Sequence, residues 1–280
     1  MKPRIGIIPG DPSGIGPELI AKLLNDETVT EQADILLIGD THLFEMGMQQ
    51  ADTSFEMTAC DVHADDWTVV SGHAHYAQYT IEPDDVSIAK VTRAGGASAL
   101  ANLNTALEFA RDGIIDAITF GPFNKAALIE AGLGHEDELH YIAEFLGVEN
   151  YVSELNTLDG LWTSRVSSHI ALKDVPGYIT KDRINEAVYL IDKTLKRSGM
   201  KRPRLSVAAL NPHGGDNGNF GREEIEVIEP AVSALQSQQI NLDGPWPSDT
   251  VFLKAKAKEV DGIITMYHDQ GQIALKLMGF

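Results

Sequence analysis

The chain has 280 residues and carries 22 Lys and Arg against 41 Asp and Glu, a formal net charge of −19 at pH 7. Nucleic acids and anionic membrane surfaces both attract basic proteins, so this charge argues against either as a partner. The 43% hydrophobic content excludes a disordered chain, and the single cysteine, Cys60, excludes a disulfide framework or a cysteine-rich zinc site.

The chain opens on a pattern typical of parallel sheets. Residues 5–8 predict a short buried strand that stops at Pro9, and residues 17–24 predict a helix. Residues 33–40 predict a second buried strand that ends in a glycine turn. Strand, glycine-rich turn, helix and strand in this order begin a parallel α/β sheet.

The same alternation continues to the end of the chain, whereas residues 51–98 differ. That region is rich in Asp, Thr, Val and His, and we expect an antiparallel excursion or a second lobe there. His73 and His75 alternate within it, which favours a solvated strand over a chelating pair. The later predicted elements are helices over 99–112, 184–197 and 223–238 and strands over 114–120, 203–210 and 260–266.

The sequence gives no sign of a membrane or export segment. The N-terminus is too briefly apolar for a signal peptide, and no apolar run reaches the roughly 18 residues that a membrane span requires. Together with the single cysteine, this leads us to expect a cytoplasmic protein.

Three histidines follow predicted strands, where ligands collect in open α/β sheets. They are His169, His213 and His268. Neutral imidazole is the commonest zinc ligand, and three protein ligands with an open position are typical of a catalytic metal. The alternative is that three of nine histidines fall near loops by chance.

Residues 10–18 form a glycine-rich turn before a helix. They lack the G-x-G-x-x-G order of a dinucleotide site, so they indicate either an anion-binding helix N-terminus or a tight turn with Pro17 at the first helical position. Lys125 and Lys276 each have two interpretations, a phosphate contact or an ordinary exposed lysine. His135, beside Glu136, is a candidate base, metal ligand or helix cap.

These stretches, in this order and over nearly the whole chain, resemble the 4-hydroxythreonine-4-phosphate dehydrogenase family. The stretches that carry the resemblance are GDPSGIGPE at 10–18, PFNK at 122–125, NPH at 211–213, Gly244-Pro245 with Asp249-Thr250, and MYHDQG at 266–271.

The resemblance implies a two-domain α/β fold like that of isocitrate and isopropylmalate dehydrogenases, with a mainly parallel central sheet. Residues 1–280 would form two interleaved lobes with a cleft between them. It further implies a homodimer whose active site lies at the subunit interface. Family members continue past the position of Phe280, and the resemblance implies that the segment absent from this chain after Phe280 carries much of the nicotinamide site and part of the substrate site.

The resemblance also implies the site residues. A divalent metal (Zn, Mg or Co) would be held by His169, His213 and His268, with His268 supplied by the partner subunit. Asp249 and Lys276 would be catalytic. Substrate would be bound by His135, Glu136, Lys125 and Lys276, and no cofactor-binding residue is assigned.

The implied activity is NAD- or NADP-linked oxidation of the secondary hydroxyl of a phosphorylated hydroxy acid. The principal substrate is 4-phosphohydroxy-L-threonine, oxidised and then decarboxylated in pyridoxine 5'-phosphate biosynthesis. Where the family has threonine this chain has Glu136, and a carboxylate repels an anionic ligand. Residues 166–172 and 271–277 look closer to D-threonate and D-erythronate 4-phosphate dehydrogenases. A cis-dihydrodiol dehydrogenase, a phosphate acyltransferase-like protein and a non-catalytic metal-binding protein are further alternatives.

Overall fold

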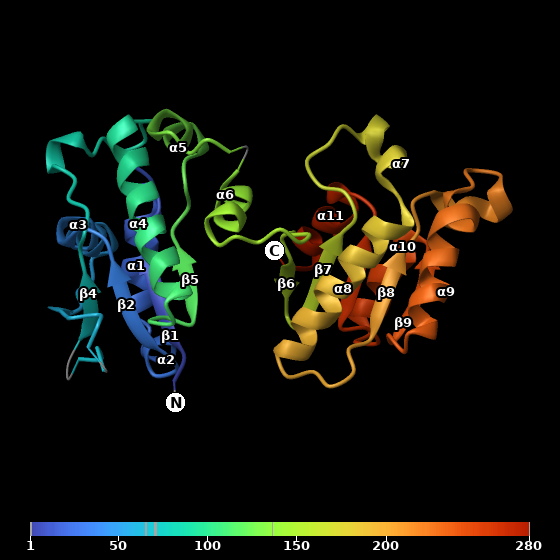
Figure 1. Ribbon diagram of the computed structural model, residues 1–280, viewed down its shortest axis with the longest axis horizontal. Helices are drawn as coiled ribbons and strands as arrows, with labels where there is room; N and C mark the ends of the chain where they lie inside the picture. Colours follow the sequence, from blue (N-terminus) through green and yellow to red (C-terminus); the bar gives the residue numbers. More distant parts are fainter. Residues whose placement is uncertain (1, 65, 70–71, 136, 280) are drawn as a thin grey trace. The chain divides into compact units, whose positions relative to one another are not determined.

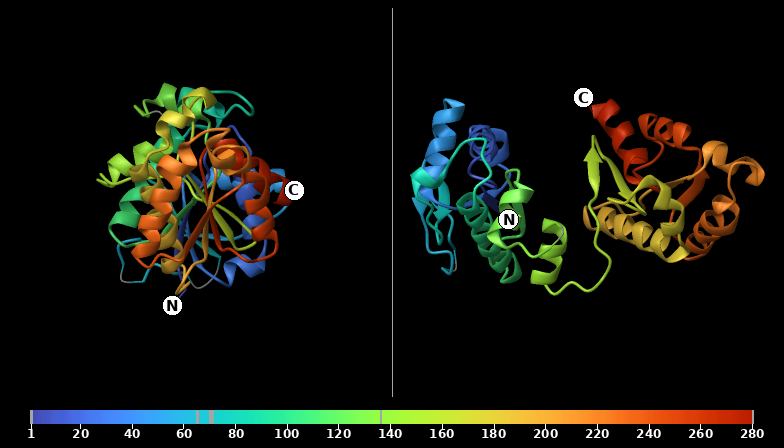
Figure 2. Two further views of the ribbon diagram at one scale, coloured as in Figure 1. Left: turned by 90° about the vertical axis from the view of Figure 1, so that its right-hand side faces the viewer. Right: turned by 90° about the horizontal axis from the view of Figure 1, so that it is seen from above.

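Figure 1 shows the computed structural model, which describes residues 2–64, 66–69, 72–135 and 137–279. The chain forms two compact units, Met1–Glu149 and Asn150–Phe280, each contiguous in sequence. Each unit is built on one five-stranded sheet with helices on both faces (Figures 1 and 2). Within the part that the structure describes, no helix is long and apolar enough to cross a membrane.

Within the described residues of the first unit, every strand pair of the sheet is parallel, and the strand order is β3-β4-β2-β1-β5. Ile5 of β1 pairs with Ile35 of β2 on one side and with Ala117 of β5 on the other. The strands are β1 (Arg4–Ile8), β2 (Asp34–Ile38), β3 (Met57–Ala59), β4 (His73–Tyr76) and β5 (Ala117–Phe120).

Side chains of β1 and β2 alternate between the two faces of this sheet, as the two-residue period of a strand requires. Ile7 and Leu37 pack with α1 (Gly16–Leu24) and α3 (Thr41–Ala51). Ile8 and Leu36 pack on the opposite face with α4 (Arg93–Arg111). A strand that is buried on both faces has a continuous run of apolar residues in its sequence. This is why residues 5–8 and 35–38 could be predicted to be strands. The remaining helical elements are α2 (Glu27–Thr30), η1 (Pro83–Asp85), α5 (Lys125–Ala131) and α6 (Glu138–Phe145).

The sheet of the second unit has the order β6-β7-β10-β8-β9, and its one antiparallel pair joins β6 to β7 at the edge. Its strands are β6 (Asn156–Leu158), β7 (Leu161–Arg165), β8 (Leu205–Ala208), β9 (Leu242–Trp246) and β10 (Gly262–Thr265). The last strand in sequence therefore lies at the centre, and the carboxyl ends of β7, β10 and β8 lie side by side.

Two helix pairs cover the two faces of the second sheet. Helices α8 (Lys181–Arg197) and α9 (Glu229–Ser237) pack on one face, and α10 (Ser248–Lys256) and α11 (His268–Gly279) pack on the other. The short elements are η2 (Leu172–Asp174), α7 (Val175–Tyr178), η3 (Pro212–Gly218) and a π turn, η4 (Glu224–Ile228). The prediction of an α/β protein with mainly parallel sheets is confirmed. The two units are contiguous in sequence rather than interleaved, and a cleft between them remains a prediction.

Two local predictions are wrong. Residues 51–98 supply neither an antiparallel excursion nor a separate lobe, because β3 and β4 extend the first sheet in parallel. His75 is not solvated: it is buried, and its Nε2 lies 2.8 Å from the carbonyl oxygen of Gly39. The helix predicted over 223–238 is confirmed, and its first turn is the π turn η4 that leads into α9.

Candidate active site

The carboxyl edge of the second sheet brings two of the predicted histidines together. Backbone hydrogen bonds from Val166 to Thr265 (2.9 Å) and from Ser167 to Met266 (3.1 Å) continue the pairing of β7 with β10 past the strand ends. The rings of His169 and His268 consequently lie with their centroids 5.7 Å apart. Both rings line a cavity of about 250 Å³, whose other lining residues are Ser168, Ile170, Leu172, Val175, Tyr267 and Asp269.

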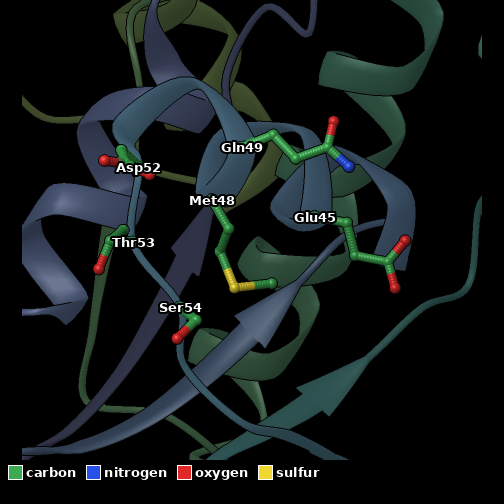
Figure 3. A pocket seen from close by; sticks show the side chains of 6 residues that line it. All are labelled: Glu45, Met48, Gln49, Asp52, Thr53 and Ser54. Carbon is green, nitrogen blue, oxygen red and sulfur yellow. The ribbon is translucent and has the colours of Figure 1, made fainter.

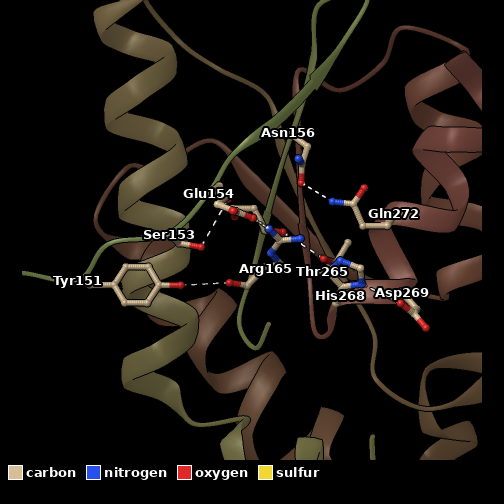
Figure 4. A network of polar contacts seen from close by, with 10 residues as sticks. Tyr151, Ser153, Glu154, Asn156, Arg165, Thr265, His268, Asp269 and Gln272 are labelled. Carbon is tan, nitrogen blue, oxygen red and sulfur yellow. Dashed lines mark hydrogen bonds and ion pairs between the residues drawn. The ribbon is translucent and has the colours of Figure 1, made fainter. Parts of the chain in front are cut away.

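His268 is held in an orientation that suits a ligand. It is the first residue of α11, and its Nδ1 lies 2.7 Å from Oδ1 of Asp269 (Figure 4). A carboxylate at Nδ1 favours the tautomer that carries its proton there, which leaves Nε2 with a free lone pair. The imidazole can therefore bind a cation, or accept a proton, through Nε2.

His213 lies in an unusual left-handed turn after β8. Residues 213–218 all have positive φ, with 56° at His213, 44° at Asp216 and 54° at Asn217. Left-handed backbone is costly for residues other than glycine, so the surrounding contacts must hold it. Gly215 fits because a Cβ there would lie 2.7 Å from Oε2 of Glu224.

The buried carboxylate of Glu224 supplies those contacts. Its side chain is inaccessible to solvent, and Oε1 accepts hydrogen bonds from the backbone nitrogens of Leu210 and Asn211, both at 2.8 Å. Oε2 accepts a further bond from Nδ2 of Asn211 at 2.9 Å. The segment that leads into His213 is therefore fixed from inside the protein.

The structure does not gather His213 with the other two histidines. Among the described residues, no group of three or more His, Cys, Asp or Glu side chains is close enough to hold a metal ion. The chemistry of the donors still suits a divalent cation, because His169 and His268 present adjacent imidazole rings, and imidazole nitrogen is a common metal ligand. The set of three histidine ligands stays a prediction. Within one chain, two of the three, His169 and His268, lie next to each other.

Asp249 and Lys276 lie on the two helices that cover one face of the same sheet. Asp249 is exposed in the first turn of α10, next to Ser248, whose hydroxyl donates to the carbonyl oxygen of Ala209 at 3.2 Å. Lys276 is exposed on α11, eight residues after His268, which corresponds to about 12 Å along a helix. Both charged groups are open to a ligand from solvent.

The first unit holds the other predicted substrate residues. His135 is half-buried, with Nε2 3.2 Å from Oε2 of Glu144. Lys125 is the first residue of α5 and is exposed. Burial alone would raise the pKa of Asp137, but hydrogen bonds from His140 and the charge of Lys125 hold this pKa below its usual range. Glu136 lies outside the described residues.

The helix-cap interpretation of His135 is wrong, because Asp137 caps α6 by accepting a hydrogen bond from the backbone nitrogen of His140 at 2.9 Å. Close packing explains the glycine-rich stretch 10–18. A Cβ at Gly16 would lie 1.9 Å from the carbonyl oxygen of Pro9, and Pro17 occupies the start of α1. The tight-turn interpretation of this stretch therefore accounts for its glycines.

A larger cavity, about 540 Å³, lies at the end of α3, and it does not suit a phosphorylated substrate (Figure 3). Its lining contains the carboxyl groups of Glu45 and Asp52 and no cationic side chain; the other lining residues are Met48, Gln49, Thr53 and Ser54. Two carboxylates repel an anion. Size alone therefore does not identify the site.

Sequence reasoning missed Arg165, a positive charge near the candidate site. Its side chain at the end of β7 is 5% exposed and forms an ion pair with Glu154 (Figure 4). Its Nε has no hydrogen-bond partner within the described part of the chain. An arginine inside an otherwise uncharged strand, four residues before His169, was the signal that could have identified it.

Comparisons with known proteins agree on one family. A family model described as pyridoxal phosphate biosynthetic protein PdxA matches residues 31–280. A relative from Pseudomonas aeruginosa, provisionally named 4-hydroxythreonine-4-phosphate dehydrogenase 2, is 48% identical over 281 residues, 99% of this chain and 83% of its own length. A relative from Oceanobacillus iheyensis, provisionally named D-threonate 4-phosphate dehydrogenase, is 35% identical over 99% of this chain and 84% of its own length.

Solved structures agree with the sequence relatives. The crystal structure of 4-hydroxythreonine-4-phosphate dehydrogenase from Klebsiella pneumoniae matches with a TM-score of 0.88 and 30% identity, over 100% of this chain and 84% of that one. Parallel sheets with imidazoles at a carboxyl edge define an α/β enzyme. More narrowly, the chain belongs to the PdxA family. The predicted family is thereby confirmed, as is the prediction of an oxidoreductase of the 4-hydroxythreonine-4-phosphate dehydrogenase type.

Proposed function

We propose that this protein catalyses the metal-dependent, NAD- or NADP-linked oxidation of the secondary hydroxyl of 4-phosphohydroxy-L-threonine. The observation that carries the proposal is the placement of His169, His213 and His268 after the neighbouring parallel strands β7, β8 and β10, at the carboxyl edge where two copies of the chain could share them, in a chain that matches the PdxA family model. The proposed location is cytoplasmic.

The metal would be held by His169, His213 and His268, and when bound it would act as a Lewis acid that lowers the pKa of the substrate hydroxyl. The hydroxyl proton then needs an acceptor, and Asp249, exposed in the first turn of α10, is the proposed one. Lys276, exposed on α11, is the second proposed catalytic residue. A bound nicotinamide cofactor would supply the redox chemistry by accepting the hydride of the same carbon. For this substrate the product is a β-keto acid, which loses CO2.

The substrate phosphate needs positive charge to offset the net charge of −19. Lys125 and Lys276 are the proposed contacts, and His135 is proposed to hydrogen-bond the substrate. Arg165, although paired with Glu154, adds a buried cation near the histidine pair. Asp269 supports His268 by fixing its tautomer.

We further propose that two copies of the chain share each site, because one chain does not gather all three histidines. Following the family resemblance, His268 of the proposed set comes from the partner subunit. Mixing His213→Ala with His268→Ala tests this directly: half of the dimers are then mixed, and each mixed dimer retains one intact site. The mixture should regain about a quarter of wild-type activity, whereas sites confined to one chain would regain none.

A second candidate substrate is D-threonate or D-erythronate 4-phosphate. Glu136 replaces the family's threonine in the predicted substrate set, and a relative 35% identical to this chain carries the D-threonate 4-phosphate name. A panel of phosphorylated four-carbon acids, each with NAD and with NADP, would separate these candidates through the absorbance of the reduced cofactor. The substrate with the highest kcat/KM identifies the activity.

Elemental analysis and a histidine variant test the metal assignment. His213→Ala should lose bound metal and keep its fold, while His63→Ala, which removes an exposed histidine from the first unit, should keep both. A His213→Ala protein with full metal content would overturn the ligand assignment. A wild-type protein that binds metal but oxidises no acid in the panel would support a binding protein without turnover.

A further inference from the structure

The side-chain amide of Gln270 is buried in the first turn of α11, and both its oxygen and its nitrogen are hydrogen-bonded. It is 9% exposed. Its Oε1 accepts a hydrogen bond from the backbone nitrogen of Met266 at 2.7 Å. Its Nε2 donates to the carbonyl oxygen of Ala209 and to the hydroxyl of Ser248, both at 2.7 Å. One side chain therefore joins three segments that are far apart in sequence.

Each partner of Gln270 lies close in sequence to a residue of the proposed site. Met266 ends the β10 segment two residues before His268. Ala209 follows β8, four residues before His213. Ser248 begins α10 and is adjacent to Asp249. The hydroxyl of Ser248 also donates to Ala209, so the amide, the hydroxyl and the carbonyl form a closed triangle.

Only an amide satisfies this arrangement, because the site needs an acceptor on one side and two donated hydrogens on the other. Met266 and Ala209 are completely buried, so water does not replace a lost bond there. Glutamate would face the Ala209 carbonyl with a lone pair, and methionine would leave the backbone N–H of Met266 unpaired and would remove one of the two donors to the Ala209 carbonyl. Buried polar groups without partners are strongly disfavoured, which makes the geometry of the three segments depend on this residue.

From this geometry we infer that Gln270 is a positioning residue, which fixes the backbone segments that carry His268, His213 and Asp249; in the proposed dimer, His268 and His213 of one chain serve different sites, and Gln270 positions both. The inference rests on the proposed function, since those three residues are its proposed metal ligands and proton acceptor. Gln270 itself touches no reacting group. It acts through the backbone of β10 and β8 and through the first turn of α10.

Gln270→Met is the main test, and Gln272→Met is its matched control. Gln272 lies two residues further along the same helix, and its Nε2 donates to Oδ1 of Asn156 at 2.7 Å, away from the site segments (Figure 4). Both variants replace a glutamine with a side chain of similar volume. They differ in whether the lost hydrogen bonds reach the proposed site.

The measurements are Co²⁺ affinity by chelator competition, the visible spectrum of bound Co²⁺, and kcat separately from KM. Gln270→Met should weaken Co²⁺ binding by about tenfold or more, alter the Co²⁺ spectrum and lower kcat more than it raises KM. Gln272→Met should stay within about twofold of wild type on each measure. Gln270→Glu should behave like Gln270→Met, because it keeps the acceptor and loses both donors. A folded Gln270→Met protein with wild-type Co²⁺ affinity and spectrum would overturn the inference.

Two further measurements keep the inference decidable. If Gln270→Met does not fold, Ser248→Ala removes one member of the triangle and should weaken Co²⁺ binding several-fold; an unchanged affinity contradicts the inference. If wild-type protein binds no Co²⁺, the proposed metal site fails independently. Hydrogen exchange then decides: Gln270→Met must loosen residues 209–213 and 266–268 more than Gln272→Met does, and equal exchange in the two variants overturns the inference.

Discussion

Replacing Glu224 with leucine should destabilise the second unit by about 4 kcal/mol. The carboxylate is inaccessible to solvent and accepts bonds from the backbone nitrogens of Leu210 and Asn211 at 2.8 Å and from Nδ2 of Asn211 at 2.9 Å. Leucine leaves the two part-buried backbone donors of Leu210 and Asn211 facing an apolar side chain, each at a cost of roughly 1–3 kcal/mol. The left-handed turn that begins at His213 also loses its internal support.

Glutamine at the same position should cost less, about 2 kcal/mol. Its amide oxygen can still accept from both backbone nitrogens, although without the strength that a charged acceptor gives. Its NH₂ group faces Nδ2 of Asn211, so one donor meets another. We therefore expect the free energy of unfolding to increase in the order Glu224→Leu, Glu224→Gln, wild type. This order is a stricter test than either value alone.

Urea denaturation measures these differences, with hydrogen exchange at residues 205–235 identifying the transition of the second unit. The control is Glu226→Leu, because Glu226 lies in the same π turn but is exposed and pairs only with Nε of Arg222 at 2.6 Å. Its loss should change stability by less than about 0.5 kcal/mol. A Glu224→Leu protein within about 1 kcal/mol of wild type would refute the reasoning.

Three other predictions concern pH, packing and specificity. Hydrogen bonds from Arg204 lower the pKa of Asp261, so this pair stabilises the fold above the unfolded pKa of about 4 and the gain is lost as pH falls through the lower folded value. The stability gap between wild type and Asp261→Asn, measured by urea midpoints, should close in acid; a gap independent of pH contradicts this. Gly96→Ala should cost about 2 kcal/mol or more in thermal or urea unfolding, because its Cβ would lie 1.9 Å from the backbone oxygen of Ala127; an unchanged midpoint would show that the helices separate freely. Glu136→Thr should raise kcat/KM for 4-phosphohydroxy-L-threonine roughly tenfold by removing a like charge, and unchanged or lower values count against the specificity argument.

The parallel strands were predictable where burial on both faces made them apolar. β1 and β2 are such strands, and both were found within a residue or two of their predicted bounds. β3 and β4 were not, because Met57–Ala59 and His73–Tyr76 are short and partly polar. These two strands exist through pairing: Leu36 of β2 opposes Ala74, and β4 in turn pairs with β3. A local window of sequence does not contain that partner.

The residues of the candidate site likewise fall into those that could be predicted from the sequence and those that could not. The histidines were found because they follow strands whose carboxyl ends meet at one edge, which is a consequence of parallel topology. Glu224 and Gln270 were missed because their partners are distant along the chain: Gln270 bonds to Ala209 across 61 positions and Glu224 to Leu210 across 14. Only the folded chain shows that these two polar side chains are buried and that both polar atoms of each form hydrogen bonds.

The order of strands in the second sheet has a consequence for synthesis of the chain. β7 and β8 are not neighbours; each pairs with β10, which lies between them and is the last strand in sequence. Until residues 262–265 leave the ribosome, the edges of β7 and β8 that face β10 have no partner strand, and unpaired edges invite aggregation. The first unit, Met1–Glu149, can complete its sheet much earlier, since its last strand ends at Phe120. At about 5–20 residues per second, the second unit stays open for roughly the several seconds that its own translation takes.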